Sequence, residues 1–221
     1  AGVTSPLRRD LGLALGASEV NLLELSAAYG PFAAGGMAAT PRLVTAVVDA
    51  DGVVLEVTPP DARPVLDPAV ASLMTSLLQS VVTDGTARSL PLHGARFPVA
   101  GKTGTTDQGR DAWFIGYTSS LLAGVWAGDD SNRALKLSGA KDALPLWAAF
   151  MKEAVADRPA EEFPRYEGLV GLHVCGESGM LALSGCPVKR DELFIPGTEP
   201  QRECSLHRGG LKGLWDRLFG R

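Results

Sequence analysis

The stretch that most constrains the fold of this chain is residues 98–106, whose sequence is PVAGKTGTT. Its last six residues contain one lysine, two glycines and three threonines, a mixture that is unusual for a plain strand. A phosphate-binding P-loop ending at this Gly-Lys-Thr would need a glycine at position 96, where Arg96 stands, so that motif is excluded. Two interpretations remain, a glycine-rich strand edge with a solvated lysine and a strand that lines a functional site. The flanking sequence has to decide between them.

The residues around this stretch favour a functional strand. It is followed by RDAWFIGYT (110–118) and GVWAGDD (124–130). This succession resembles the transpeptidase domain of class A, bifunctional penicillin-binding proteins, in which a Lys-Thr-Gly strand serves serine acyl transfer. The resemblance extends over residues 13–41, 144–151 and 194–207 and so covers nearly the whole chain. By this resemblance, the chain corresponds to the C-terminal part of that domain.

The resemblance implies an α/β (α+β) fold in which helices flank a central antiparallel sheet, part of the transpeptidase fold that penicillin-binding proteins share with β-lactamases. The residues themselves favour the same sheet. Three β-rich segments, 99–105, 112–118 and 121–127, follow one another with short connections, which is typical of adjacent antiparallel strands. The sequence therefore predicts that Lys102 lies on a strand of this sheet.

Capping and turn residues predict the other elements. Ser18 would cap a helix that Gly30 and Pro31 end, and Asp51-Gly52 would join two strands in a hairpin. Asp67 and Pro68 would begin a second helix. Its expected buried stripe consists of Val70, Leu73, Met74, Leu77, Leu78 and Val81. Further helices are expected at 142–156 and, as a short amphipathic segment, at 211–219.

The composition limits the domain organisation and the partners. With 221 residues, of which 45% are hydrophobic, the chain can bury one core. Glycine, proline and charge increase beyond Pro164, so we divide the chain into a transpeptidase part, 1–160, and a small tail, 161–221. The net charge of -4 excludes a general affinity for nucleic acid. The apolar runs are shorter than the roughly 20 residues of a membrane span, and we expect the chain to begin inside a longer protein.

The resemblance assigns roles to the central strand. The hydroxyls of Thr103 and Thr105 would hold the carboxylate of a stem peptide ending in D-Ala-D-Ala, and the N–H of Thr105 would be a donor to the oxyanion. Strand alternation places Lys102 on the opposite face, where it would set the electrostatic field and pair with the nucleophile side. Gly104 would let a substrate backbone lie against the strand. β-Lactam antibiotics would bind at the same place, and neither a cofactor nor a metal is expected.

Two motifs of this family do not precede position 98. They are the Ser-x-x-Lys that carries the nucleophile and the Ser-x-Asn that accompanies it. The Ser-x-x-Lys at Ser138–Lys141 follows the strand in a glycine-containing loop, so we interpret it as non-catalytic. We likewise interpret Asp111 and the pair Asp129-Asp130 as local hydrogen-bonding groups at turns. We therefore expect this chain to supply about half of an active site and to be inactive alone.

Joined to the upstream part of the same protein, the chain would cross-link peptidoglycan at the extracytoplasmic face of the bacterial inner membrane. A glycosyltransferase domain and an N-terminal membrane anchor are implied only by the resemblance. Two alternatives stay open. The chain could be a non-catalytic module that binds muropeptide or a partner protein, which the lack of a Ser-x-x-Lys motif in the complete protein would indicate. It could also be a β-lactamase or D,D-carboxypeptidase relative, which fast deacylation would indicate.

Three cysteines, Cys175, Cys186 and Cys204, lie in the last quarter of the chain. They form no Cys-x-x-Cys pair, and the nearest histidine is His207, so the spacing argues against a zinc site. In an oxidising compartment Cys186 and Cys204 would form a disulfide that closes a loop rich in proline and glycine. In a cytoplasmic protein all three thiols would be free. Cys175 receives no role from the sequence.

Overall fold

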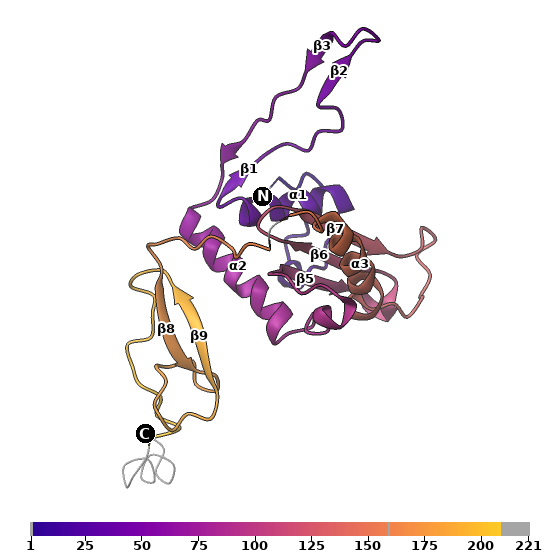
Figure 1. Cartoon of the computed structure of the whole chain (residues 1–221). Helices are drawn as coiled ribbons and strands as arrows, with labels where there is room; N and C mark the ends of the chain where they lie inside the picture. The colour runs from indigo at the N-terminus through magenta and orange to yellow at the C-terminus, as the bar shows by residue number, and fades with distance from the viewer. Residues whose placement is uncertain (1, 159, 209–221) are drawn as a thin grey trace. The chain divides into compact units, whose positions relative to one another are not determined.

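The computed structural model describes residues 2–158 and 160–208, and the helix predicted at 211–219 lies outside them. The chain divides into an N-terminal unit, Ala1–Pro164, and a C-terminal unit, Arg165–Arg221 (Figure 1). Within the described ranges, no helix combines the length and the apolar character that crossing a bilayer requires.

The centre of the N-terminal unit is a three-stranded antiparallel sheet of β5 (Ala100–Thr105), β6 (Ala112–Tyr117) and β7 (Leu122–Ala127), in the order β5-β6-β7. The three strands predicted from the sequence are confirmed to within one residue at each end. The central strand β6 is buried at every position except Trp113, which is half-buried. Strand β5 lies at one edge, and its Lys102 is opposite Ile115 of β6. The Lys-Thr-Gly segment therefore has a neighbouring strand on one side only within this sheet.

Helices cover both faces of this sheet. Phe114 and Tyr117 of β6 are three residues apart, so their side chains point to opposite faces. Phe114 packs against α3 (Leu144–Ala154), whereas Tyr117 belongs to a second cluster that contains Leu78 of α2 (Pro68–Thr83). Helix α2 lies along β5 (Figure 1), and α1 (Leu22–Ala33) packs mainly on β7. The predicted arrangement of a central sheet flanked by helices is present.

Helix α1 begins and ends later than the sequence predicted. Asn21, not Ser18, is the N-cap, and its side chain accepts the N–H of Glu24 at 2.9 Å. The Ser18 hydroxyl instead accepts the N–H of Arg8 at 2.9 Å. The helix continues through Pro31 to Ala33, although proline removes one helical hydrogen bond and crowds the preceding turn. Because Pro31 is buried, the packing of its ring offsets part of this cost.

Helix α2 has the predicted N-terminus, but only part of its predicted buried face is buried. The Asp67 carboxylate accepts the N–H of Ala69 at 2.7 Å, and Pro68 occupies the first turn, as expected. Val70 and Leu77, however, are 37% and 49% exposed. The buried positions are Ala69, Ala71, Thr75 and Leu78. Small side chains allow the helix to approach the sheet closely, which the hydrophobicity pattern alone does not reveal.

Thr75 can be buried because its hydroxyl is fully used. It donates to the carbonyl of Ala71 at 3.0 Å and lies 2.9 Å from the hydroxyl of Tyr117. Burial raises the pKa of Tyr117 to about 12, and the hydrogen bond with Thr75 lowers it by less. The hydrogen bond between Thr75 and the neutral Tyr117 thus connects α2 to the central strand.

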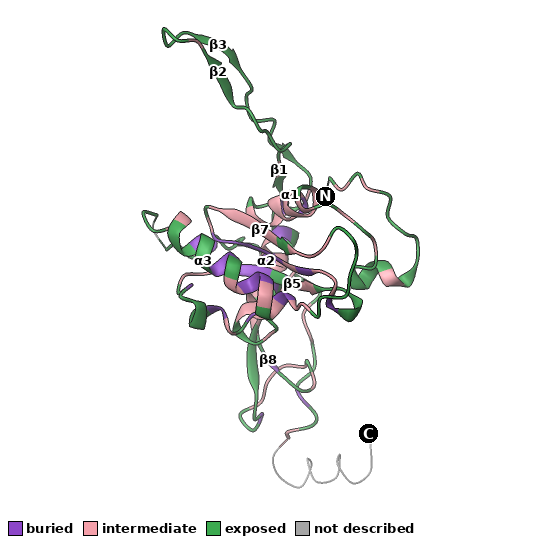
Figure 2. Cartoon of the chain, turned by 90° about the vertical axis from the view of Figure 1, so that its right-hand side faces the viewer, coloured by how far each residue is buried: buried purple, intermediate pink, exposed green. Residues whose placement is uncertain are grey.

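The remaining elements of the N-terminal unit are short. The predicted hairpin is confirmed as β2 (Ala46–Val48) and β3 (Val54–Val57), and both strands are exposed along their whole length (Figure 2). Strands β1 (Met37–Ala38) and β4 (Arg63–Pro64) pair at its base. Short 3-10 helices span Leu11–Leu15, Leu90–His93 and Asp107–Gly109, and a π-helical turn, Gly139–Ala143, precedes α3.

The described part of the C-terminal unit, 165–208, contains one antiparallel strand pair, β8 (Val170–Cys175) and β9 (Lys189–Phe194). Its three cysteines are buried, and none of them forms a disulfide. The predicted Cys186–Cys204 bridge, which was expected to close the tail, is not seen in the structure. Cys175, which receives no role from the sequence, joins the other two cysteines in one cluster instead of remaining apart from them.

Candidate functional site

The exposed part of β5 carries the residues that the sequence singled out. Lys102 and Thr105 are exposed, Gly104 is half-buried, and Thr103 is 9% exposed. The side-chain ammonium of Lys102 donates to the backbone carbonyl of Thr103 at 2.8 Å. Among the described residues, no carboxylate forms an ion pair with Lys102. The cation is thus held along the strand while its charge remains uncompensated by a neighbouring acid.

The β5–β6 ladder determines which backbone groups face the open edge. The N–H of Thr106 donates to the carbonyl of Asp111 at 3.1 Å, which continues the ladder one residue beyond β5. In an antiparallel pair, hydrogen-bonded and non-hydrogen-bonded residue pairs alternate. Thr105 and Thr103 therefore belong to the non-hydrogen-bonded positions, and their N–H and C=O groups point away from β6. The Thr105 N–H, predicted as an oxyanion donor, lies on the side where a ligand could reach it.

The two threonines assigned to a substrate carboxylate differ in their surroundings. The hydroxyl of Thr103 lies 2.6 Å from that of Thr86, in the loop after α2, and the Thr103 side chain is buried. The hydroxyl of Thr105 accepts the N–H of Gly139 at 2.9 Å. Since that bond uses an oxygen lone pair, the proton of the Thr105 hydroxyl can still be donated to an anion. Of the two hydroxyls, that of Thr105 is therefore the one more available for a further hydrogen bond.

Gly139 is the residue of this site that the sequence reasoning missed. It begins the π-helical turn before α3 and fits directly against β5 and β6. A Cβ at this position would lie 2.5 Å from the carbonyl oxygen of Gly104 and 2.7 Å from that of Trp113. Only glycine allows the turn to approach and hydrogen-bond Thr105. Gly139 lies within the Ser138–Lys141 segment that was interpreted as a non-catalytic loop, and a glycine in such a loop gives no sequence signal for this role.

Gly139→Ala is therefore expected to destabilise the N-terminal unit by about 1–3 kcal/mol, the usual cost of forcing a methyl group into a packed site. The clash is with backbone oxygen atoms, which cannot rotate away. Urea unfolding followed by circular dichroism would measure the change. Gly30→Ala is the suitable control, because its methyl group would lie in open space and should change the free energy of unfolding much less. Gly52→Ala is unsuitable as a control, because Gly52 has a positive φ of 83° that alanine disfavours. Equal stability of Gly139→Ala and the parent would contradict the proposed fit.

Gly104 has a packing role in addition to the predicted one. A Cβ built on it would lie 3.1 Å from the Cβ of its cross-strand neighbour Trp113. Strand β5 therefore needs a small residue here even without substrate. The predicted approach of a substrate backbone to Gly104 stays a prediction.

The acidic residues and the second Ser-x-x-Lys have local roles. Asp111 accepts from the indole N–H of Trp126 at 2.9 Å and from the Thr106 hydroxyl at 3.0 Å, which confirms the local assignment. Asp129 likewise accepts the N–H of Ser131 within its turn. Ser138 has an extended backbone before the π-helical turn, and its N–H donates to Asp142 at 2.7 Å. No contact with Lys102 is found for Ser138 in the described part of the chain.

A cavity of about 280 Å³ lies at the other end of β5 and does not include its exposed residues. Its lining comes from the segment before β5, the β6–β7 turn and the end of α3, and includes Phe97, Pro98, Ser120, Lys152 and Arg158. The exposed end of β5 and this cavity are therefore separate places in the N-terminal unit.

The known proteins compared here with this chain are penicillin-binding proteins. Residues 7–134 match the family described as "Penicillin binding protein transpeptidase domain", and residues 165–209 match "Penicillin-binding protein 1A, C-terminal domain". Penicillin-binding protein 1A of Aquifex aeolicus is 37% identical over 204 residues, which are 90% of this chain and 27% of that protein. Penicillin-binding protein 2D of Bacillus subtilis is 34% identical over 211 residues, 92% of this chain and 30% of that protein. The chain thus spans less than a third of the length of these relatives.

Solved structures show the same similarity. The crystal structure of penicillin-binding protein 1A from Haemophilus influenzae superposes with a TM-score of 0.79 at 28% identity, over 87% of this chain and 34% of that one. PonA1 from Mycobacterium tuberculosis, in complex with penicillin V, superposes with a TM-score of 0.64 at 26% identity, over 75% of this chain and 50% of that one. The similarity therefore extends to the three-dimensional fold.

Proposed function

The chain belongs to the class A penicillin-binding proteins and comprises part of their transpeptidase domain together with the 1A-type C-terminal domain, and on this premise we propose that it supplies the Lys-Thr-Gly wall of a D,D-transpeptidase site. The observation that carries this proposal is the exposed edge of β5. The exposed part of this strand carries the Lys102 ammonium, held by the Thr103 carbonyl, and the hydroxyl and N–H of Thr105.

These groups match what acyl transfer from a peptide ending in D-Ala-D-Ala requires. The Thr105 hydroxyl donates to the terminal carboxylate, and the positive charge of Lys102 attracts the same anion. The N–H of Thr105 donates to the oxygen that becomes negative in the tetrahedral intermediate. Thr103 can join the carboxylate site only if its contact with Thr86 opens, so we place it second to Thr105.

The nucleophile comes from outside these 221 residues in this proposal. A serine in a Ser-x-x-Lys motif attacks the carbonyl of the penultimate D-Ala, the terminal D-Ala leaves, and the amine of a second stem peptide then displaces the serine. A β-lactam would acylate the same serine when its amide bond opens. The complete protein would work at the outer face of the bacterial inner membrane, where its membrane anchor and a glycosyltransferase domain would precede the present chain.

Labelling with a fluorescent penicillin tests this proposal. The 221-residue chain alone is expected to remain unlabelled, whereas the complete protein becomes covalently labelled, because only the latter combines the nucleophile with β5. Ser138→Ala should leave labelling of the complete protein unchanged, since Ser138 only precedes the π-helical turn, makes no side-chain capping hydrogen bond there and has no catalytic role in this proposal. Labelling of the isolated chain at Ser138 would overturn the assignment. Rapid loss of the label from the complete protein would indicate a β-lactamase or carboxypeptidase instead.

A further inference from the structure

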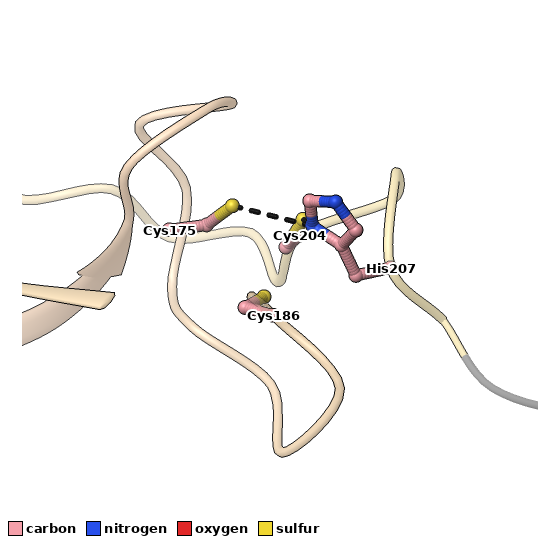
Figure 3. Close-up of side chains that lie close together, drawn as sticks. All are labelled: Cys175, Cys186, Cys204 and His207. Atoms are coloured by element: carbon pink, nitrogen blue, oxygen red, sulfur yellow. Dashed lines mark hydrogen bonds between the residues drawn. The ribbon is translucent and has the colours of Figure 1, made fainter. Parts of the chain in front are cut away.

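Four side chains with metal-binding atoms meet in the C-terminal unit. Cys175 ends β8, Cys186 lies in the loop before β9, and Cys204 and His207 follow β9. Their three sulfur atoms and a ring nitrogen of the histidine all lie within 4.8 Å of one another. Figure 3 shows the four side chains directed toward a common point from separate segments of the chain. The three cysteines are buried, and the histidine closes the cluster on one side.

The separations are those of ligands around a small cation. Nδ1 of His207 lies 3.4 Å from Sγ of Cys175 and 3.3 Å from Sγ of Cys204. A tetrahedral zinc ion with Zn–S of about 2.3 Å and Zn–N of about 2.0 Å places neighbouring sulfur and nitrogen ligands about 3.6 Å apart. Two neighbouring sulfurs would be about 3.8 Å apart by the same geometry. The cluster needs only small movements to reach either value.

Groups around the cluster hold its members in a metal-binding orientation. While Nδ1 of His207 faces the cysteines, its Nε2 lies 3.3 Å from a carboxylate oxygen of Glu177. A histidine that binds a metal through one nitrogen usually donates the other N–H to such an acceptor, which fixes its tautomer. At another of the four residues, the N–H of Leu183 donates to Sγ of Cys186 at 3.3 Å. Such a donor stabilises negative charge on sulfur. Thiolates, not thiols, are the ligands of zinc, so binding of the ion would release the protons of the cysteine thiols.

We propose that Cys175, Cys186, Cys204 and His207 form a structural Zn²⁺ site of the Cys3His class. Three thiolates and one imidazole are a ligand set that zinc prefers, and four protein ligands leave no open position for a substrate. A disulfide would use two of the cysteines and leave the third thiol and the histidine beside it without a function. The zinc site uses all four and also gives Cys175 a role.

A bound metal would add the stabilisation that the small apolar core of this unit does not provide. Among its described residues, the buried apolar side chains are Val174 and the three cysteines themselves, with Met180, Ala182 and Leu183 packed against the cysteines. Units of this size commonly depend on a metal or on disulfides, because their apolar burial alone is too small. Binding free energy at a structural zinc site is folding free energy. The C-terminal unit should therefore be ordered by the ion.

The spacing of the cysteines in the sequence does not indicate this site. The search for Cys-x-x-Cys found none, but Cys204 and His207 form a Cys-x-x-His pair. The other two ligands come from the end of β8 and from the loop before β9, and the β8–β9 pairing positions the segments that carry them. A pattern search for closely spaced pairs cannot detect ligands that approach only after strand pairing.

Metal binding by the 221-residue chain tests the site. Chain purified under reducing conditions and supplied with Zn²⁺ is expected to hold one ion per chain in native mass spectrometry. With Co²⁺ in its place, the absorption of tetrahedral cobalt and of sulfur-to-cobalt charge transfer should appear. His207→Gln should lose the bound ion or bind it far more weakly. His173→Gln is the matched control, because His173 lies on β8 of the same unit but pairs with Asp191 at an exposed position.

Glu177→Gln distinguishes a direct effect on zinc affinity from a general effect on folding. This change keeps all four ligands but weakens the acceptor for the histidine N–H, so the zinc affinity should fall about 10- to 100-fold while one ion per chain still binds at saturation. The proposal would be overturned if peptide mapping of protein from the cell envelope found a disulfide between two of these cysteines and no zinc. Zinc binding that is unchanged in Cys204→Ser would overturn it as well. Neither result bears on penicillin labelling, so this proposal and the proposed function can fail separately.

Discussion

Lys102→Ala in the complete protein is expected to slow acylation by a fluorescent penicillin at least about 100-fold, which corresponds to about 2.7 kcal/mol of transition-state stabilisation. The reason lies in the position of the side chain. Lys102 is exposed at the edge of the sheet, its ammonium is held by the Thr103 carbonyl, and among the described residues no acid neutralises it. Its charge is therefore directed at whatever binds along β5. Stopped-flow or gel-based measurement of the second-order acylation rate would determine the loss.

Two variants sharpen this experiment. Lys152→Ala removes an exposed lysine on α3, next to the separate cavity, and should leave the acylation rate nearly unchanged. Thr105→Ala keeps the backbone N–H but removes the hydroxyl, so it should also slow acylation. If Lys102→Ala were acylated as fast as the parent, β5 would not line the reaction site. The assignment of the strand would then have to be abandoned even though the fold is unchanged.

Trp147→Ala is expected to lower the free energy of unfolding of the N-terminal unit by about 3–5 kcal/mol. Trp147 is fully buried on α3, stacks edge-to-face on Phe114 with ring centroids 5.0 Å apart, and donates its indole N–H to the carbonyl of Ala123 at 3.0 Å. Gly116 provides the space for the indole, because a Cβ there would lie 2.9 Å from the ring. Truncation would thus leave a cavity between α3 and the sheet. Urea denaturation would measure the loss.

Phe150→Ala is the matched control for this prediction. It removes another aromatic side chain from the same helix, but Phe150 is 57% exposed, so its loss should cost far less than that of Trp147. A similar loss of stability in both variants would mean that burial of the side chain against the sheet does not determine the effect, because alanine has a higher helix propensity than either aromatic residue. A large loss in Trp147→Ala should also slow acylation in the complete protein, because α3 is preceded by the turn that contacts Thr105.

Much of the fold followed from local patterns in the sequence. The three strands around Lys102, the hairpin at Asp51-Gly52 and the start of α2 at Asp67 were predicted, because each depends on alternation, a turn pair or a cap within a few residues. The errors arose where distant residues decide the outcome. Helix α1 continues through the buried Pro31 beyond its predicted end, and α2 packs on the sheet through small side chains together with Leu78 of the predicted stripe.

In the candidate site, too, some features follow from the local sequence and others only from the tertiary structure. The sequence by itself determined that Lys102, Thr103 and Thr105 lie on one strand with alternating directions, and the flanking residues determined the family. Only the tertiary structure decided that Thr86 engages Thr103 while Gly139 leaves the Thr105 hydroxyl able to donate. It also brought Cys175 to Cys186, Cys204 and His207. Local sequence specifies backbone direction and turn chemistry, but contacts between residues far apart in the chain depend on packing, which no short pattern encodes.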